Sequence, residues 1–455
     1  MHGWNEDIEQ VAQSVLTYAR DRLRLDPVPL DAPRSAAELE AAVGQTITAG
    51  GLGGEEALRR FTEVLAQACL SIDHPRYLSF IPCAPTEAAM LFDLVVGASS
   101  IYGGSWLEGS GAVFAENQAL AWLAGLAGLP DAAGGVFVQG GTIGNLSALV
   151  AARHRARGRR TAAGTDGEPT RWAIAASTEV HSSVRAAASV MDVDLVLVEV
   201  DEHRRLRGEA LERALAAAPG STEVFAVVAS AGTTNLGIVD DLASVATVAG
   251  AHGLWFHVDG AYGAAALAAP SARWRFDGIE RADSFVVDPH KWLFAPFDCA
   301  ALLYRDPNEA RAVHTQQAGY LEPVQGEGEW NPSDFSVQLS RRARGLPFWF
   351  SLASFGTVAY TDAIERTLEV TRYAAREIGS RSDLELLREP DLSVVCFRRL
   401  GWDRADYYAW SERLLHDGIG LVTPTTLDGE VVARFCIVNP VTTEADIDLL
   451  LDSMR

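Results

Sequence analysis

The sequence predicts an α/β protein built on an open, mostly parallel sheet of seven strands. Short apolar or β-branched segments alternate with longer helical patterns between about residues 135 and 305, as is typical of parallel sheets covered by helices. The 455 residues, 48% hydrophobic and 22% charged, also suffice for a large core and two or three structural units. The expected strands are VFV at 136–138, WAIAA at 172–176, DLVLVEV at 194–200, VFAVVA at 224–229, LWFHV at 254–258, DSFVVD at 283–288 and AALLY at 300–304.

The regions on either side of these strands have other patterns. Helical spacing of apolar residues predicts an N-terminal arm at residues 1–75, whose apolar face needs the rest of the chain or a second subunit to cover it. Residues 76–345 are expected to form the large α/β domain, with a lid loop at about 310–335, where periodicity is weak. Helices and strands alternate again over 346–455, which predicts a small C-terminal α/β domain.

Charge and cysteine content exclude several classes of function. The chain has 38 Lys and Arg against 60 Asp and Glu, a formal charge of -22, so its surface repels nucleic acid and anionic membranes. The five cysteines are scattered without a CxxC pair, which argues against disulfides and structural zinc. A secretory signal and a segment long enough to span a bilayer are both missing from the pattern. We therefore expect a cytoplasmic protein with no nucleic acid or membrane partner.

The strand VFV leads into QGGTIGN and then into a helical pattern. Gly140 and Gly141 allow backbone amides to approach a ligand closely, while Thr142 and the helix N-terminus offer hydrogen-bond donors to a phosphate. The motif lacks the GK[ST] of a P-loop and the GxGxxG of a dinucleotide fold. It therefore indicates an anion site of another kind, with a plain strand-to-helix turn as the alternative.

Two ionisable residues follow predicted strands. Asp259 ends an apolar strand in LWFHVDGAYG, where a buried carboxylate needs a cationic partner; an aspartate that caps the next turn is the alternative. Lys291 lies in DPHKWLF, an apolar setting in which a lysine tends to lose its proton and can form a Schiff base. The alternative is a lysine that extends its ammonium group to solvent.

Together, a phosphate cradle, a carboxylate for a pyridinium nitrogen and an imine-forming lysine are what pyridoxal 5'-phosphate requires from a protein. His181, in EVHSSV, can stack on the cofactor ring or simply begin a helix. Ser230, in SAGTTNLG, can hydrogen-bond the cofactor or cap the following helix. The histidines lack HExxH-like spacing, so we expect no metal.

In this order, the motifs resemble those of the group II pyridoxal-phosphate decarboxylases, which include aromatic amino acid and glutamate decarboxylases. HVDGAYG and SFVVDPHKW carry most of the resemblance, together with GGTIGN, EVHSSV and AGTT. It extends from about His74 to SRRARGLPFWF at 340–350. The resemblance implies the fold type I architecture of pyridoxal-phosphate-dependent transferases and a homodimer with shared active sites.

The resemblance also implies a role for individual residues. Lys291 forms the internal aldimine with the cofactor, Asp259 keeps the pyridine nitrogen protonated, and His181 stacks on the ring. The other residues implied around the cofactor are Gly141, Thr142 and His290 at the phosphate, Asp288 nearby, and Ser230 and Ala261 beside the ring; Gly140 joins them from the glycine turn described above.

The sequence departs from the family pattern in the lid. Counting back from Ser340 without gaps places Pro332 where aromatic-type enzymes carry a lid tyrosine, which is thought to reprotonate the α-carbon. Tyr320 is the predicted substitute, with Trp330 as an alternative. Replacement of this tyrosine is associated in the family with oxygen-dependent, aldehyde-forming chemistry.

The substrate is predicted from HPRYLSFIP, which places Phe80 and Ile81 where aromatic-type enzymes have pocket residues, and from nearby Trp106. These side chains indicate an apolar or aromatic substrate and equally suit a packed dimer interface. We therefore predict a pyridoxal-phosphate-dependent carboxy-lyase acting on such an L-amino acid. The alternatives are a decarboxylative oxidase that forms an aldehyde, other α-carbon chemistry, and a catalytically silent scaffold.

Overall fold

A computed structural model describes residues 2–165, 169–317, 319 and 329–455. Its centre is a seven-stranded sheet in the order β1-β7-β6-β5-β4-β2-β3, which confirms the predicted mixed architecture. Strands β2 to β6 pair in parallel, whereas β7 runs antiparallel to both of its neighbours. The strands are β1 (Gly134–Val138), β2 (Arg171–Ser177), β3 (Asp194–Val198), β4 (Thr222–Ser230), β5 (Trp255–Asp259), β6 (Ser284–Val287) and β7 (Ala300–Tyr304).

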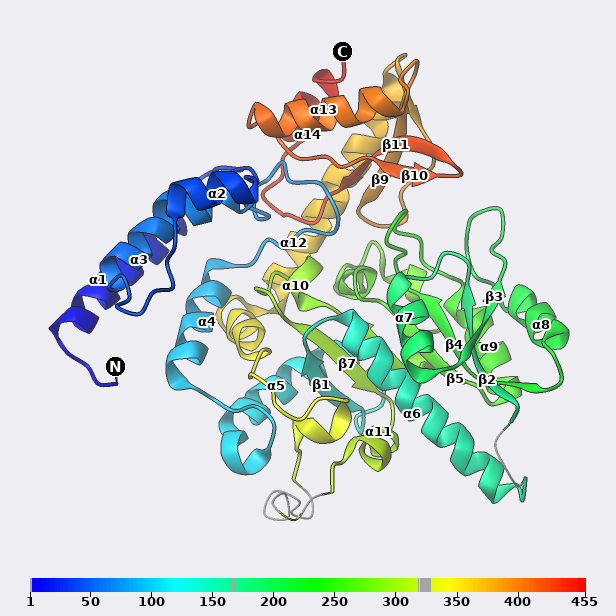
Figure 1. Cartoon of the computed structure of the whole chain (residues 1–455). Coiled ribbons are helices and arrows are strands. Elements are labelled where there is room, and N and C mark those ends of the chain that lie inside the picture. The colour runs from blue at the N-terminus through cyan, green and yellow to red at the C-terminus, as the bar shows by residue number, and fades with distance from the viewer. Residues whose placement is uncertain (1, 166–168, 318, 320–328) are drawn as a thin grey trace.

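Helices cover both faces of this sheet, as Figure 1 shows. Along β4, Val227 and Ala229 enter one hydrophobic core, while Ala226 and Val228 enter the other, because successive side chains of a strand point to opposite faces. The helices that contribute to the second core are α6 (Gly141–Ala162), α7 (Ser182–Met191) and α11 (Pro307–His314). Those of the first core are α5 (Trp106–Leu126), α8 (Gly208–Ala217), α9 (Leu242–His252) and α12 (Leu346–Ser380).

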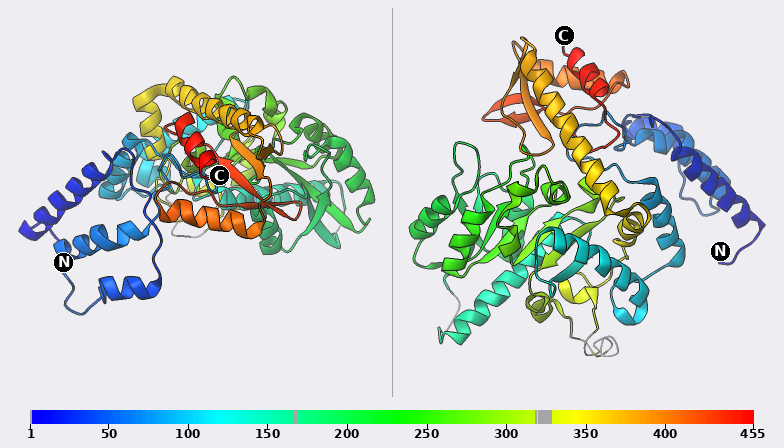
Figure 2. Two further views of the ribbon diagram at one scale, coloured as in Figure 1. Left: turned by 90° about the horizontal axis from the view of Figure 1, so that it is seen from above. Right: turned by 180° about the vertical axis from the view of Figure 1, so that it is seen from behind.

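The helices predicted near the N-terminus form an arm that projects from the body of the molecule in Figures 1 and 2. The arm consists of α1 (Glu6–Arg22), α2 (Ala36–Val43) and α3 (Gly54–Arg60). No residue of α1 is buried, and α1 contacts α3. Further along, Leu30 packs with Tyr77 and Leu421, and α4 (Glu87–Ser99) leads toward α5.

The segment predicted as a lid loop begins with regular structure. Helix α11 extends to His314, beyond the predicted start of the loop. Its signals are local: the Asp306 side chain accepts a hydrogen bond from the Asn308 amide, and Pro307 is the first helical residue. A short 3-10 turn, Pro332–Phe335, lies at the end of the predicted loop.

The C-terminal part is a second, smaller α/β layer, visible beside the large sheet in Figure 1. Helix α12 leads into it, with an interruption at Gly356, where φ is 76° and glycine avoids the strain of a side chain. Thr443 begins the last helix with a capping box. The elements are β8 (Leu384–Leu386), β9 (Val394–Arg399), α13 (Arg404–His416), β10 (Thr425–Leu427), β11 (Glu430–Cys436) and α14 (Glu444–Asp452), with the strands antiparallel.

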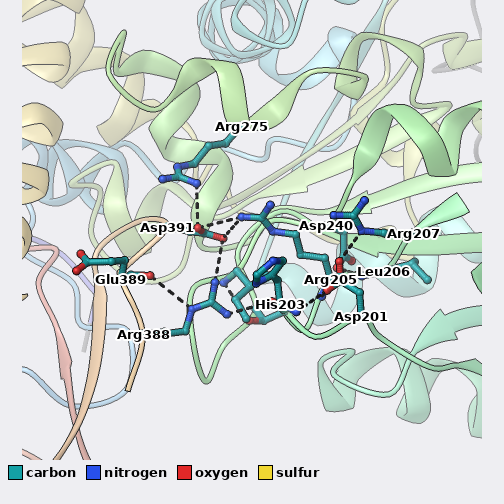
Figure 3. A network of polar contacts seen from close by, with 12 residues as sticks. Asp201, His203, Arg205, Leu206, Arg207, Asp240, Arg275, Arg388, Glu389 and Asp391 are labelled. Atoms are coloured by element: carbon teal, nitrogen blue, oxygen red, sulfur yellow. Dashed lines mark hydrogen bonds and ion pairs between the residues drawn. The ribbon is translucent and has the colours of Figure 1, made fainter. Parts of the chain in front are cut away.

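An ion cluster joins the two α/β layers. The carboxylate of Asp391, ahead of β9, lies 3.0 Å from Arg205 Nη2 and 2.9 Å from Arg275 Nη1, both in the large layer. Arg388 Nη2 lies 3.6 Å away. Figure 3 shows the three guanidinium groups converging on this carboxylate. Within the described part of the chain, no helix is both long and apolar enough to cross a membrane.

Candidate active site

The carboxyl ends of β4, β5 and β6 bring the predicted site residues together. Ser230 ends β4 and Asp259 ends β5, and the strand register makes them direct neighbours. On the other side, Asp259 is in register with Val286 of β6, and Asp288 follows that strand. Ligands of open α/β sheets bind beyond these strand ends, so the topology itself concentrates the polar residues at one edge.

The glycine turn approaches the same edge from β1. Gly140 precedes α6, and a Cβ on Gly141 would lie 2.9 Å from the Cβ of Ala261, so a larger residue would push these segments apart. The Gly141 amide donates to Asp288 Oδ2 at 3.2 Å. The close approach explains why the sequence has glycine at position 141.

Lys291 lies on the short helix α10 (Pro289–Trp292), with its Nζ 2.9 Å from Asp288 Oδ2. Burial favours the neutral amine, but the carboxylates of Asp288 and Asp259 outweigh it and raise the pKa of Lys291 above its ordinary value. The prediction of a neutral amine in an apolar setting was therefore wrong for the protein without a ligand. The reason is the Asp288 carboxylate. Asp288 and Lys291 are three residues apart, and the turn of α10 places their side chains next to each other.

His290 is buried beside this pair. Its Nδ1 accepts from the Cys299 amide at 3.1 Å, and its ring centre lies 4.6 Å from that of Phe297. Burial lowers the pKa of His290, against the opposing effect of Asp288, so the ring is neutral near pH 7. Its Nε2 lies 3.6 Å from Asp288 Oδ2, too far for a hydrogen bond.

Among the residues that the structure describes, no cationic side chain is in direct contact with Asp259. Its Oδ2 accepts from Asn145 Nδ2 at 2.9 Å, and its Oδ1 accepts from the Ala261 amide at 3.2 Å. The expected positive partner is thus replaced by two neutral donors, while Lys291 acts through the field of its charge.

His181 is the residue before α7 and caps it, because its Nδ1 accepts from the Ser183 amide at 3.2 Å. The helix-start interpretation is therefore confirmed. The same imidazole also lines the cavity described next, so capping the helix does not prevent His181 from contacting a ligand.

All these residues surround one cavity of about 420 Å³. The predicted residues that line it are Gly140, Gly141, Thr142, His181, Ser230, Asp259, Ala261, Asp288, His290, Lys291, Phe80 and Ile81. One further predicted residue that the structure describes, Trp106, does not line it. Trp106 begins α5, where its amide donates to Asn331 Oδ1, and it is absent from the cavity lining. Tyr320 lies outside the described residues.

The lid position also has a structural outcome. Pro332 is buried at the start of its 3-10 turn, and neither Pro332 nor Trp330 lines the cavity. The Trp330 ring stacks on Phe335 with centres 4.2 Å apart. This packing holds Trp330 against β1 and does not support it as a proton donor.

Several cavity residues were missed by sequence reasoning, chiefly Asn145, Ser183 and Phe297. The sequence signals for these residues were weak: Asn145 is the last residue of the GGTIGN motif, and Ser183 lies two residues after His181. Phe297 carried no local signal, because its approach to His290 depends on the turn between α10 and β7. Arg434 of β11 also supports the wall, donating to the Phe80 carbonyl at 2.8 Å.

The polar atoms of the cavity fit a bound phosphorylated aldehyde. Gln139 Oε1 and Asp288 Oδ1 are buried acceptors with no hydrogen-bond donor among the described residues, and such atoms are costly unless a donor group of a ligand reaches them. A primary amine, a strand-end carboxylate and a helix N-terminus face the same space. These are the donor and acceptor types that pyridoxal phosphate uses.

Comparison with known proteins agrees with this geometry. A family model described as the pyridoxal-dependent decarboxylase conserved domain matches residues 55–400. The chain is 28% identical to an aromatic-L-amino-acid decarboxylase of Bacillus atrophaeus, over 97% of this chain and 93% of that protein. It is 31% identical to an L-2,4-diaminobutyrate decarboxylase of Rhizobium meliloti (strain 1021), over 89% and 82% respectively. The crystal structure of mouse CSAD matches with a TM-score of 0.90 at 28% identity, over 99% and 98%.

Fold and cavity together define an enzyme that works with pyridoxal phosphate. The chain belongs to the pyridoxal-dependent decarboxylase family and is a carboxy-lyase of that family. The predicted family, cofactor and reaction class are thereby confirmed.

Proposed function

We propose that Lys291, Asp259 and the Gly140–Thr142 turn bind pyridoxal phosphate in this cavity, and that the chain decarboxylates an L-amino acid with an apolar or aromatic side chain. The observation that carries the proposal is the convergence of a lysine, a carboxylate and a glycine turn, distant in sequence, on one cavity. Bound pyridoxal phosphate supplies an electron sink for the pair released when an α-bond of the substrate breaks.

The residues around Lys291 manage its proton. A protonated amine cannot attack an aldehyde, so the Lys291 proton must leave first. Asp288 Oδ2, 2.9 Å from Nζ, is the acceptor best placed to take it. The raised pKa of Lys291 means that the ligand-free site keeps this proton, and with it the charge that attracts an anionic ligand.

Three further parts of the cavity would orient the cofactor in this proposal. The N-terminus of α6 and the Thr142 hydroxyl favour a phosphate group, with His290 beside them. Asp259, held by Asn145 and the Ala261 amide, would keep the ring nitrogen protonated. His181 would stack on the ring.

Phe80, Ile81 and Phe297 support the choice of substrate. These apolar side chains line the cavity. Phe80 is 62% exposed, so its ring is available to a ligand. The two relatives compared above are named for different amino acids. The choice of an apolar or aromatic substrate therefore depends on the apolar residues of the cavity wall and not on membership of the family.

A substrate screen tests the proposal. The purified protein, loaded with pyridoxal phosphate, is given each common L-amino acid and L-2,4-diaminobutyrate, while CO2, oxygen, ammonia and amine are measured together. We expect the fastest CO2 release from aromatic or large apolar substrates and none from Lys291→Ala. Preference for an acidic or diamino substrate would refute the substrate assignment alone. No CO2 from any substrate would refute the reaction.

An aldehyde-forming activity is the second candidate, favoured by buried Pro332 at the position counted for the lid tyrosine. In that reaction the amino acid, O2 and water yield an aldehyde, CO2, ammonia and hydrogen peroxide. Oxygen uptake matched to ammonia and peroxide release would identify it. An amine product without oxygen uptake would exclude it.

We further propose a homodimer. Large apolar side chains are exposed on neighbouring elements of one side of the molecule, including Leu91 and Leu94 of α4, Phe114 of α5 and Val358 of α12. Patches of this kind mark interaction sites, and the projecting arm in Figure 2 needs a surface of its own. Sedimentation should give a dimer at micromolar concentration, and a monomer there would refute the proposal.

Shared active sites are tested by mixing subunits. Trp106 begins α5 on this apolar side and misses the cavity of its own chain, so we assign it to the partner's cavity. Alone, Lys291→Ala should be inactive and Trp106→Ala weakly active. When the two are mixed, activity should rise above that of either variant, because one cavity of the mixed dimer is complete. No gain on mixing would assign Trp106 to packing.

We place the protein in the cytoplasm. All five cysteines are free thiols, as expected in a reducing compartment. Fractionation of the native host cells should find the protein with soluble cytoplasmic markers, and enrichment in a secreted fraction would contradict this.

A further inference from the structure

A line of buried side chains runs under the cavity from the core of the sheet. Trp255 Nε1 donates to Ser284 Oγ at 2.8 Å, and Ser284 Oγ lies 2.8 Å from His257 Nδ1. His257 Nε2 then lies 2.8 Å from Asn145 Oδ1. His257 has no exposed surface and Asn145 only 1%, so water has no access to these contacts.

The line divides at Asn145 and reaches the cavity twice. Its Nδ2 donates to Asp259 Oδ2 at 2.9 Å and to Ser183 Oγ at 2.9 Å. Ser183 Oγ in turn lies 2.8 Å from His181 Nδ1. The Asn145 amide thus connects Asp259, which it contacts directly, with His181, which it reaches through Ser183. The carbonyl end of the same amide is held by His257.

The chemistry of the groups gives this line one direction. The Trp255 indole can only donate, so Ser284 accepts and its hydroxyl hydrogen is free for His257 Nδ1. Burial lowers the pKa of His257 to about 4, so the ring is neutral and carries its proton on Nε2, which donates to Asn145 Oδ1. The reverse direction would turn the Asn145 carbonyl toward the Asp259 carboxylate, which is repulsive.

We propose that His257 and Asn145 are positioning residues that fix the orientation of Asp259 and, through Ser183, the tautomer of His181. This rests on the proposed function, in which these two groups face the cofactor ring. With Nδ1 of His181 accepting from Ser183, its proton lies on Nε2. Five polar groups buried in a sheet core are costly unless their hydrogen bonds serve a purpose that apolar packing cannot.

The experiment compares shape with hydrogen bonding at position 257. His257→Phe keeps a ring and removes both nitrogens, whereas His257→Gln keeps a donor near the place of Nε2. The readouts are the dissociation constant of pyridoxal phosphate and the pH midpoint of the absorbance change of the bound cofactor. The ionisable groups around Asp259 that enter this titration are His257, Lys291, Asp288 and His181.

We expect His257→Phe to shift the pH midpoint by about one unit or more and to weaken cofactor binding about 10-fold or more. His257→Gln should stay within about 0.3 units of the wild type, although it is the poorer match in shape. A purely structural role predicts the opposite ranking. Equal midpoints and affinities in His257→Phe and the wild type would overturn the proposal.

Two more variants keep the test decisive. If His257→Phe fails to fold by circular dichroism, Asn145→Asp replaces it, because aspartate matches asparagine in shape but sets a carboxylate against Asp259. It should shift the midpoint by at least as much, and an unchanged midpoint would overturn the proposal. Ser183→Ala leaves the Asn145 to Asp259 contact intact and should shift the midpoint less than either variant. A wild type that shows no cofactor absorbance would instead refute the proposed function.

Discussion

The hydrogen-bonded line beneath the cavity and the ion cluster around Asp391 both bury polar groups, but by different means. Beneath the cavity, neutral donors follow one another from Trp255 to Asp259, each with a defined direction. Around Asp391, three guanidinium groups, 22–28% exposed, share one carboxylate that is 7% exposed. Directional bonds fix the orientation of a group, whereas a shared charge fixes only proximity. The first arrangement suits a reacting site and the second suits a junction.

The largest effect is expected where the hydrogen-bonded line meets the cavity. Asp259→Asn removes the only charge of that line and should lower kcat/KM about 10²–10³-fold, the usual loss for one preorganised electrostatic contact. Steady-state kinetics with the best substrate measure this. Asp391→Asn, the matched change in the ion cluster, should lower kcat/KM less than about threefold. Similar losses in both variants would erase the functional difference between the two regions.

The sequence-based prediction succeeded where pattern alone determines position. All seven strands of the large sheet were identified, because strands buried on both faces are continuous apolar segments, whether they pair in parallel or, like β1 and β7, antiparallel. Asp259 and Lys291 were correctly brought to one edge, since each follows a strand and the carboxyl ends of parallel strands meet there. Motif order then led to the family.

The contacts made at that edge could not be predicted. Asn145 meets residues 38 and 112 positions away, and no local spacing encodes such meetings. The protonation state of Lys291 was predicted wrongly, because the prediction considered only the apolar residues next to it in the sequence. In the structure, the contact with the Asp288 carboxylate raises the pKa of Lys291. Trp106 was grouped with Phe80 because the two are near each other in the sequence. In the structure Trp106 begins α5 and does not line the cavity that Phe80 lines.

The ion cluster should give the largest effect on stability. Asp391→Ala leaves Arg205, Arg275 and Arg388 facing one another without their carboxylate. Removing one partner of a fully buried pair costs 3–5 kcal/mol, and the partial exposure of the arginines reduces the expected loss in unfolding free energy to about 2–3 kcal/mol. Urea unfolding measures it. High salt should shrink the loss by screening the arginines, and a loss that salt leaves unchanged would contradict the electrostatic account.

The buried line should instead show itself through pH. The pKa of His257 is lowered from 6.5 to about 4 by burial, so between these values the unfolded chain binds more protons and the folded chain loses stability as pH falls. Between pH 7 and pH 5, His257 alone should lower the free energy of unfolding by about 1–2 kcal/mol. In His257→Gln the fall in unfolding free energy over this interval should be smaller by that amount.

Other groups cancel in this comparison. His74 and His314, whose pKa values are lowered to about 4, have the same sign as His257. Asp240, with its pKa raised to about 7 by burial, has the opposite sign, because its stabilising effect is lost as pH rises. All three are present in both proteins. Equal pH slopes for His257→Gln and the wild type would mean that His257 is already protonated in the folded state.

The smallest effect is expected from the most distant arginine of the cluster. Arg388 Nη2 lies 3.6 Å from Asp391, which keeps Arg205 and Arg275 at 3.0 and 2.9 Å. Burial lowers the pKa of Arg388 and also that of Arg275, but Arg388 lies farther from the carboxylate and so gains less from it. Arg388→Gln should change the unfolding free energy by less than about 1 kcal/mol, measured beside Arg205→Gln, which should lose more. If Arg388→Gln were as damaging as Asp391→Ala, the cluster would act as one cooperative network, and the contrast with the directional line would lose its basis.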